Sequence, residues 1–214
     1  MFENIMSAKR HSLLEQLTQL NILQDFYLAG GTAAALYLGH RWSEDLDFFS
    51  EQKFDSFLLG EKLAQIDGFL LTGQEQGTLH CFINDVKLSF LYYPYSLLRT
   101  GEIYKKVLVA DLVDIALMKL VAVVQRGTRK DFVDLYFLDK EQVSFEEMLR
   151  SYPLKFPVKT YQPLLLLKSF GYFEDAEQEK MPKMFRDTSW EEIKKHFLLR
   201  QKELTLNIMK DTKL

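Results

Sequence analysis

The chain has 214 residues, of which 47% are hydrophobic and 27% charged, enough for one large or two small domains with a proper core. A formal net charge of −3 excludes a generally basic nucleic-acid coat protein, so any nucleic-acid contact would need a local basic patch. The single cysteine, Cys81, excludes an internal disulfide, and no Cys or His cluster near it indicates a zinc site.

The sequence predicts no membrane association. Charges interrupt residues 1–20, which lack the continuous apolar core of a signal peptide. The most apolar stretch, residues 107–124, is interrupted by Asp111, Asp114 and Lys119 and is a poor candidate for a bilayer span. We therefore expect a cytoplasmic protein.

The first half of the chain mixes helical and strand periodicities. Helices are predicted over Ser12–Leu23, Thr32–Leu38 and Phe54–Ile66, and strands over Phe26–Ala29, Asp45–Phe49, Leu79–Ile83 and Val86–Tyr92. The last two strands flank Asn84-Asp85, which predicts a hairpin.

After about residue 105 every periodic signal is helical. Helices are predicted over Leu112–Gln125, Arg129–Leu138, Phe145–Arg150, Tyr161–Phe170 and Trp190–Met209. The pattern indicates an α+β (α/β) chain: a mixed sheet packed on helices in residues 1–105, followed by a C-terminal helical bundle in residues 106–214.

Two acids on the predicted strand indicate a metal site. Alternate residues of a strand point to one face, so the carboxylates of Asp45 and Asp47 lie side by side. Two such carboxylates repel each other unless a cation lies between them. Mg²⁺ is the natural partner, because it binds carboxylate oxygens and bridges to phosphates. We expect Asp45 and Asp47 to be metal ligands and catalytic residues.

A glycine pair lies where a strand gives way to a helix. At Gly30 and Gly31 the backbone can approach a phosphate closely, and the helix start offers free N–H groups. Thr32 either caps this helix or donates its hydroxyl to a phosphate oxygen. Each signal alone is weak, since Asp-x-Asp is common and Gly-Gly more often marks a tight turn. Their combination is more specific.

Residues 30–49, GGTAAALYLGHRWSEDLDFF, resemble the AbiEii/AbiGii toxin-like (abortive-infection) nucleotidyltransferase family of the polymerase-β-type nucleotidyltransferase superfamily. Gly30, Gly31, Arg41, Ser43, Asp45 and Asp47 match its pattern of Gly-Gly or Gly-Ser and then Arg-x-Ser-x-Asp-φ-Asp-Phe. Residues 119–138, KLVAVVQRGTRKDFVDLYFL, are similar to its downstream motif, and residues 171–185 to its C-terminal region.

The resemblance implies a nucleotidyltransferase-like fold and a Mg²⁺-dependent enzyme that moves a nucleotide from a nucleoside triphosphate to an acceptor hydroxyl. The acceptor would be a tRNA, a protein or a small molecule. A toxin-type role in a bacterial toxin–antitoxin or phage-defence system is implied, with an antitoxin protein as a partner. Residues implied to bind substrate in the first block are Gly30, Gly31, Thr32, Arg41 and Ser43.

The second block adds positive charge that a triphosphate requires. Lys119 and Arg126 are seven residues apart and share one helix face, and they are expected to bind substrate. A solvated basic face is the plainer alternative. Asp131 either pairs with or caps the basic helix or, as the resemblance implies, acts as acid or base on the acceptor hydroxyl. Lys130 and Asp131 are therefore the catalytic candidates of this block.

One feature departs from the family pattern. Polymerase-β-type enzymes carry a third carboxylate on a later strand, and the matching strand here has Ser89 in its place. Asp85 at the turn, or Asp131, would have to substitute, or the metal is held by two acids and the nucleotide. If none of these arrangements holds a metal for catalysis, the protein is a non-catalytic nucleotide-binding or interaction module. Sugar-nucleotide glycosyltransferases also use Asp-x-Asp, but only 44 residues precede Asp45, too few for their nucleotide-binding half.

Overall fold

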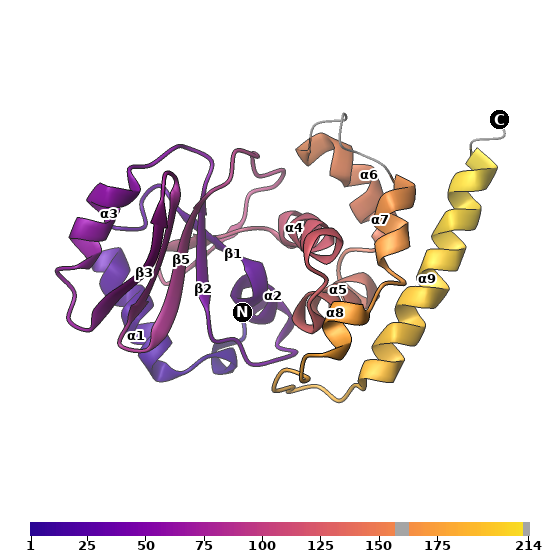
Figure 1. Ribbon diagram of the computed structural model, residues 1–214, viewed down its shortest axis with the longest axis horizontal. Helices are drawn as coiled ribbons and strands as arrows, with labels where there is room; N and C mark the ends of the chain where they lie inside the picture. The colour runs from indigo at the N-terminus through magenta and orange to yellow at the C-terminus, as the bar shows by residue number, and fades with distance from the viewer. Residues whose placement is uncertain (157–162, 212–214) are drawn as a thin grey trace. The chain divides into compact units, whose positions relative to one another are not determined.

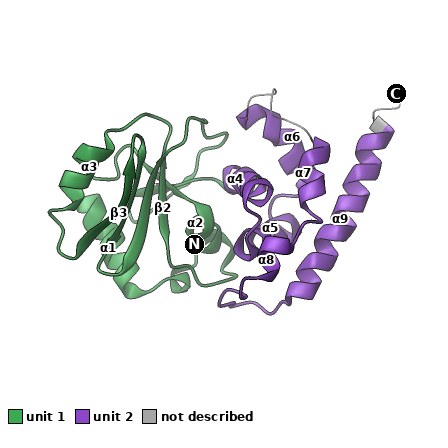
Figure 2. Cartoon of the chain, in the orientation of Figure 1, with its two compact units in different colours: residues 1–111 green, residues 112–214 purple. Residues whose placement is uncertain are grey.

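The computed structural model describes residues 1–156 and 163–211. The chain divides into two compact units, residues 1–111 and 112–214 (Figure 2). The first unit extends beyond residue 105 because β7 (Val107–Val109) pairs in parallel with β1 (Tyr27–Ala29) and is part of its sheet.

The first unit is a mixed sheet packed on helices, as predicted. Its other elements are η1 (Glu3–Ile5), α1 (Ala8–Gln19), α2 (Gly30–Leu38), β2 (Leu46–Ser50), α3 (Ser56–Leu63), β3 (Phe69–Glu75), β4 (Thr78–Ile83), β5 (Val86–Tyr92) and β6 (Glu102–Tyr104). The seven strands lie in the order β3-β4-β5-β2-β1-β7-β6. The β1–β7 and β2–β5 pairs are parallel and the other pairs antiparallel.

The fully buried side chains of β2 lie on one face of this sheet. Leu46 and Phe48 of β2 are fully buried, and the Phe48 ring stacks on Phe90 of β5 with 5.1 Å between centroids. The helix α3 packs against β3 and β4, where the Ser56 hydroxyl donates to the Glu75 carbonyl at 2.6 Å. Figure 1 shows α1 and α3 on one side of the sheet and α2 on the other. The alternation along β2 thus separates a core face from a second face.

Several predicted boundaries differ from those in the structure. The helix predicted over Ser12–Leu23 is α1, which ends at Gln19 because the chain turns through Asn21 at φ 55°. The strand β3 was not predicted, because most of its residues are exposed or half-exposed and show no alternation. The strands β6 and β7 were also missed, since each has three residues and Lys105-Lys106 between them is not a typical turn sequence.

The second unit is the predicted helical bundle. It contains α4 (Leu112–Gln125), α5 (Arg129–Glu141), α6 (Phe145–Lys155), α7 (Pro163–Ser169), α8 (Glu174–Glu177) and α9 (Trp190–Asp211). Phe145, Phe170 and Phe197 form an aromatic core with ring centroids 4.5 to 5.4 Å apart. The helix predicted from Tyr161 starts outside the described residues, and α7 begins at Pro163.

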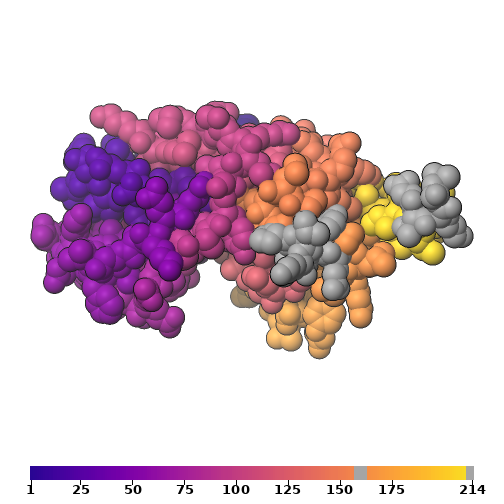
Figure 3. Space-filling view, turned by 90° about the horizontal axis from the view of Figure 1, so that it is seen from above, coloured from indigo at the N-terminus to yellow at the C-terminus, as the bar shows by residue number. Residues whose placement is uncertain are grey.

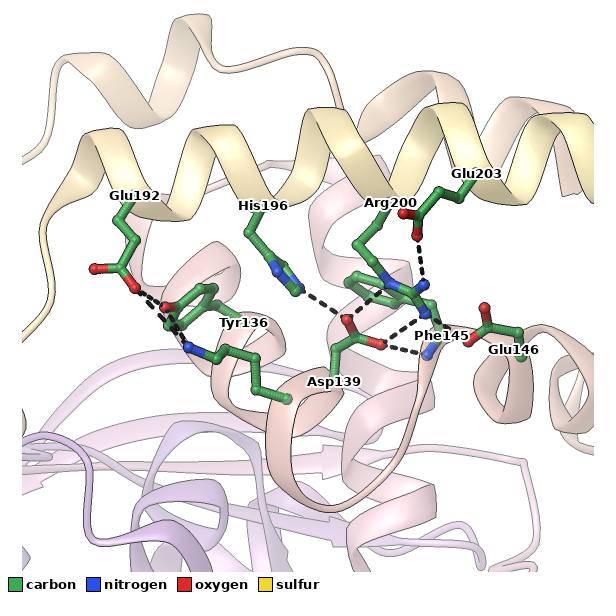
Figure 4. A network of polar contacts seen from close by, with 9 residues as sticks. Tyr136, Asp139, Phe145, Glu146, Glu192, His196, Arg200 and Glu203 are labelled. Atoms are coloured by element: carbon green, nitrogen blue, oxygen red, sulfur yellow. Dashed lines mark hydrogen bonds and ion pairs between the residues drawn. The ribbon is translucent and has the colours of Figure 1, made fainter.

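A polar network attaches α9 to α5 (Figure 4). Nε2 of His196 lies 2.8 Å from Oδ2 of Asp139, and Nε of Arg200 donates to the same oxygen at 3.1 Å. Burial by itself raises the pKa of Asp139, but the contacts with His196, the Phe145 N–H and Arg200 outweigh burial and hold it below its ordinary value. The face of α9 that carries His196 and Arg200 is therefore turned inward. Among the described residues, no helix combines the length and apolar character that crossing a bilayer requires.

Candidate active site

Asp45 and Asp47 lie on the face of β2 opposite Leu46 and Phe48. Asp45 directly precedes β2, and Asp47 is the second residue of that strand. Both side chains are half-exposed, whereas Leu46 and Phe48 are fully buried. Since alternate strand residues point the same way, the two carboxylates project side by side from a rigid strand.

The neighbours of Asp47 on this face follow from the strand register. Asp47 pairs with Ala29 of β1 on one side and with Ser89 of β5 on the other, and Ser89 pairs with His80 of β4. Directly paired residues share a face and lie about 5 Å apart. Ser89 is therefore the immediate neighbour of Asp47, at the place where the third carboxylate of the superfamily was expected.

Asp85 does not substitute for that carboxylate. It lies in the β4–β5 turn, four residues before Ser89, or about 13 Å along the strand. Its side chain is 97% exposed and pairs with Lys9 of α1 at 3.1 Å. The suggestion that Asp85 completes the acid cluster is therefore wrong.

The first turn of α2 lies against Asp47. Gly30 begins this helix with φ +67°, and a Cβ on it would lie 3.0 Å from Oδ2 of Asp47. Only glycine combines that backbone conformation with so close an approach. The N–H groups of the first helical turn, which have no acceptor within the helix itself, thus lie near Asp47, where the helix start favours an anion such as phosphate.

Thr32 and Ser43 hold the segment that leads to Asp45. Their hydroxyl oxygens are 2.7 Å apart, both side chains are buried, and the Thr32 hydroxyl also donates to the Asp45 carbonyl. Arg41 is buried as well and donates to the Trp42 carbonyl at 3.0 Å. Thr32 does not cap α2, whose N-cap residue is Ala29. These contacts fix the position of Asp45 relative to α2.

A second acid cluster lies in the second unit, around Asp131 of α5. Its Oδ1 accepts from Nζ of Lys119 at 2.8 Å and Nη2 of Arg126 at 3.2 Å. Its Oδ2 accepts from Nε of Arg126 at 2.9 Å and the Thr128 hydroxyl at 2.6 Å. Burial alone raises the pKa of Asp131, but Lys119 and Arg126 overcome that effect and lower it to about 2.

The structure thus brings Lys119, Arg126 and Asp131 together. Lys119 is buried and also pairs with Asp134 at 2.7 Å, so a solvated basic face does not describe it. The Arg126 side chain is 63% exposed, and Lys130 is exposed outside the cluster. The sequence left two roles open for Asp131, an ion pair with the basic helix or an acid or base acting on the acceptor hydroxyl. These contacts favour the ion pair.

A model of the family described as "Nucleotidyl transferase AbiEii toxin, Type IV TA system" matches residues 12–87 and 94–205. The chain belongs to the AbiEii nucleotidyl transferase toxin family. The AbiEii chain is also 35% identical over 209 residues to an uncharacterized protein of Aquifex aeolicus, covering 94% of this chain and 98% of that protein.

Solved structures share the AbiEii fold. A Helicobacter pylori protein assigned as a nucleotidyltransferase is similar with a TM-score of 0.55 and 17% identity, covering 98% of both chains. The nucleotidyltransferase toxin MenT4 of Mycobacterium tuberculosis gives a TM-score of 0.54 and 16% identity, covering 90% of this chain and 83% of MenT4. The predicted nucleotidyltransferase-like fold is confirmed, and by its family this AbiEii protein is a nucleotidyltransferase.

The chemistry of the acid pair in this AbiEii protein fits a magnesium ion that would be bound by phosphate oxygens as well as by the two carboxylates. In the part of the chain that the structure describes, no group of three or more His, Cys, Asp or Glu side chains is arranged to hold a metal. Asp45 and Asp47 offer two carboxylates on one face, and the missing Cβ of Gly30 leaves room beside Oδ2 of Asp47. Mg²⁺ commonly binds one or two carboxylates and takes its other ligands from phosphates and water.

Sequence reasoning missed two neighbours of these clusters. The contact between Thr128 and Asp131 carries a recognisable signal, since a Thr three residues before an acid at a helix start is a capping-box pattern. His80 carries no local signal of its own, and only the two-residue hairpin turn pairs it with Ser89. Only the parallel pairing of Ser89 with Asp47 brings this row of residues to the acid pair.

Proposed function

We propose that this protein binds a nucleoside triphosphate with Mg²⁺ at Asp45 and Asp47 and transfers the nucleotide to an acceptor hydroxyl. The observation that supports this most is the geometry of the acid pair. Two half-exposed carboxylates project from one face of β2, beside the start of α2. A carboxylate pair of this kind can share a cation with phosphate oxygens, while the helix start favours their negative charge.

In the proposed reaction the acceptor oxygen forms a bond to the α-phosphorus, the α–β phosphoanhydride bond breaks, and pyrophosphate leaves. The acceptor proton passes to water or to a protein base. Bound magnesium would neutralise charge on the phosphates and on the leaving pyrophosphate. Asp45 and Asp47 hold that ion, and Gly30 and Gly31 provide backbone N–H groups for phosphate oxygens. Thr32, Arg41 and Ser43 keep this loop in place.

The exposed cations Arg126 and Lys130 are proposed to balance substrate charge. Lys119 and Asp131 act by fixing Arg126, since both oxygens of Asp131 bind this guanidinium. The ionised Asp131 is a weak base because its pKa is about 2. We therefore assign Asp131 the role of positioning Arg126. The alternative, that Asp131 takes the proton of the acceptor hydroxyl, is tested by kinetics.

The acceptor is proposed to be a tRNA, a protein or a small molecule. The cellular role is proposed to be that of a cytoplasmic toxin in a bacterial toxin–antitoxin system with a cognate antitoxin. The test is incubation of the protein with Mg²⁺, each α-³²P-labelled nucleoside triphosphate, and total tRNA or cell extract. Transfer of label by the wild type but not by Asp45→Asn supports the proposal. If no labelled product forms with any nucleotide, nucleotidyl transfer to these acceptors is excluded.

A second candidate is a non-catalytic nucleotide-binding module on the same fold. The residue that favours it is Ser89, which places a hydroxyl directly opposite Asp47 where a third carboxylate would complete the metal site. Equilibrium dialysis with labelled nucleotide separates the two candidates. Mg²⁺-dependent binding without transfer or hydrolysis would select the module.

A further inference from the structure

The helices α7 and α9 of the second unit each present leucines to solvent. On α9, Leu198, Leu199 and Leu206 are 49%, 51% and 49% exposed. On α7, Leu164 and Leu165 are 57% and 51% exposed, although the next residues of that helix are buried. The last turns of α9 are visible at the surface in Figure 3, in yellow. These leucines are not required by the core of the unit.

Part of this surface is concave. A groove of about 390 Å³ lies between α7 and α9, with Leu164, Leu206 and Thr205 in its lining. The two helices pack on each other, and Nε2 of Gln201 on α9 donates to the Leu167 carbonyl of α7 at 2.7 Å. We call this feature the α7/α9 groove. A groove between two packed helices can receive apolar side chains presented by a third helix.

The charge around the α7/α9 groove is positive. Lys168 and Lys202 line it, and within residues 1–156 and 163–211 neither lysine has an ion-pair partner. Two exposed acids of α9 already have partners, because Glu203 binds Arg200 at 2.8 Å and Glu191 binds Lys194 at 2.8 Å. The described lining of the groove thus contains two lysines and no acid, and an acidic ligand would balance this charge.

We propose that the α7/α9 groove binds an acidic amphipathic helix of a partner protein. Apolar residues at positions i, i+3, i+4 and i+7 of that helix enter the groove and cover the exposed leucines. Its acidic residues meet Lys168 and Lys202, which raises the rate of encounter and selects acidic partners. This interaction is independent of nucleotide transfer at the acid pair.

Two other occupants fit the observations less well. A second copy of the chain would bring its own Lys168 and Lys202 against this positive surface, and like charges oppose that contact. A lipid surface would have to accommodate Glu203, which lies between Leu199 and Leu206 on the same side of α9 and is 57% exposed. A helix in the groove leaves Glu203 at the rim, in water.

The test uses the full chain and a fluorescent synthetic peptide of about 20 residues, with leucines at i, i+3, i+4 and i+7 and glutamates elsewhere. Fluorescence anisotropy should show saturable binding that Leu206→Glu and Lys202→Glu each weaken at least about tenfold. Lys202→Glu should in turn improve binding of the counterpart peptide with lysine in place of glutamate. The matched control Leu70→Glu changes an exposed leucine of β3 in the first unit and should have no effect.

The proposal fails if the acidic peptide does not bind, or if a scrambled or lysine-containing peptide binds the wild type equally well. It also fails if sedimentation shows a dimer that Leu206→Glu dissociates, which would make a second copy the occupant. Flotation with anionic vesicles that is lost in Leu206→Glu would select a membrane. Since Leu206 is half exposed, its variant should keep the wild-type melting temperature within a few degrees. If it does not, Leu164→Glu replaces it, because Leu164 also lines the groove and is 57% exposed.

Discussion

The molecule contains two acid pairs that differ in how far they are buried. Asp131 and Asp134 of α5 are fully buried, and the protein supplies their cations through Lys119 and Arg126. Asp45 and Asp47 of the first unit are only partly buried, on the face of β2 opposite Leu46 and Phe48. The comparison indicates that a fully buried acid pair with its own lysine and arginine serves structure, whereas a pair that solvent reaches is accessible to an ion from solution.

The difference arises from local geometry. On a helix, acids three residues apart lie on one face, and a lysine from a neighbouring helix can reach both of them, as Lys119 does. On a strand, acids two residues apart project from a rigid surface, and here the glycine at the start of α2 keeps space open beside them. The predictions below test this division between a structural and a functional pair.

The largest expected effect is on stability. Asp131→Ala should lower the free energy of unfolding by about 3–5 kcal/mol, because it leaves buried Lys119 with less compensation. Asp45→Ala should change it by no more than about 0.5 kcal/mol, as expected for an accessible residue outside the core. Urea unfolding followed by circular dichroism measures both. Equal losses in the two variants would remove the distinction between the pairs.

The role of Asp131 requires a second readout. Asp131→Asn keeps the shape of the side chain, and if Asp131 only positions Arg126 it should weaken nucleotide binding as much as Arg126→Ala does. A proton-transfer role would instead lower kcat with nucleotide affinity unchanged, and would shift the acid limb of the pH–rate profile.

The next effect is on turnover. Asp45→Asn and Asp47→Asn should each lower kcat for nucleotide transfer by about 10²–10³-fold, since either change removes a ligand of the ion that stabilises phosphate charge. Label transfer at saturating nucleotide and a series of Mg²⁺ concentrations measures the loss. Glu44→Gln is the matched control, because Glu44 is an exposed acid next to Asp45. Turnover that stays at the wild-type level in both Asp variants would exclude this acid pair as the metal site.

Much of the fold was predictable because its signals are local. The strand that carries the acid pair follows from the alternation of Asp45 to Phe49, and α4 was predicted with the bounds it has in the structure. The missing strands have physical reasons. The residues of β3 lack alternation, and β6 and β7 are too short to show a period. A short strand is defined by the strand it pairs with, and pairing partners are distant in sequence.

The candidate site was predictable only in part for the same reason. The spacing of Asp45 and Asp47 specifies their common face, but no local pattern specifies that Ser89 pairs with Asp47 in a parallel register. Nor does the sequence specify burial. Thr32 and Ser43 have the chemistry of phosphate ligands, yet their hydroxyls bind each other, and the buried Lys119 pairs with two acids.

Lowering the pH should remove stability that the buried Asp131 contributes, by a smaller amount than the mutation of Asp131 to Ala. The pKa of Asp131 is about 2 in the folded protein against an ordinary 3.8, so its ion pairs stabilise the fold fully above about pH 4. This contribution of about 2 kcal/mol is lost as the pH falls towards 2. The stability difference between wild type and Asp131→Asn should therefore shrink over that interval in urea titrations. A difference that stays constant from pH 5 to pH 2 would show that Asp131 has no lowered pKa.

The smallest expected effect on stability comes from adding a third carboxylate to the pair formed by Asp45 and Asp47. Ser89→Asp places a carboxylate beside Asp47 on the same face, where like charges on paired residues repel. Without divalent cations this should cost about 1–2 kcal/mol, because Ser89 is only 5% exposed. Magnesium should reverse the loss, raising the melting temperature of Ser89→Asp by several degrees and that of wild type by less. Ser89→Asn controls for packing, because its side chain has a similar size but no charge. Replacing EDTA by Mg²⁺ should raise its melting temperature only as much as that of the wild type. If Mg²⁺ stabilises Ser89→Asp no more than Ser89→Asn, the carboxylates of Asp47 and residue 89 do not share an ion. The acid pair would then need another explanation than metal binding.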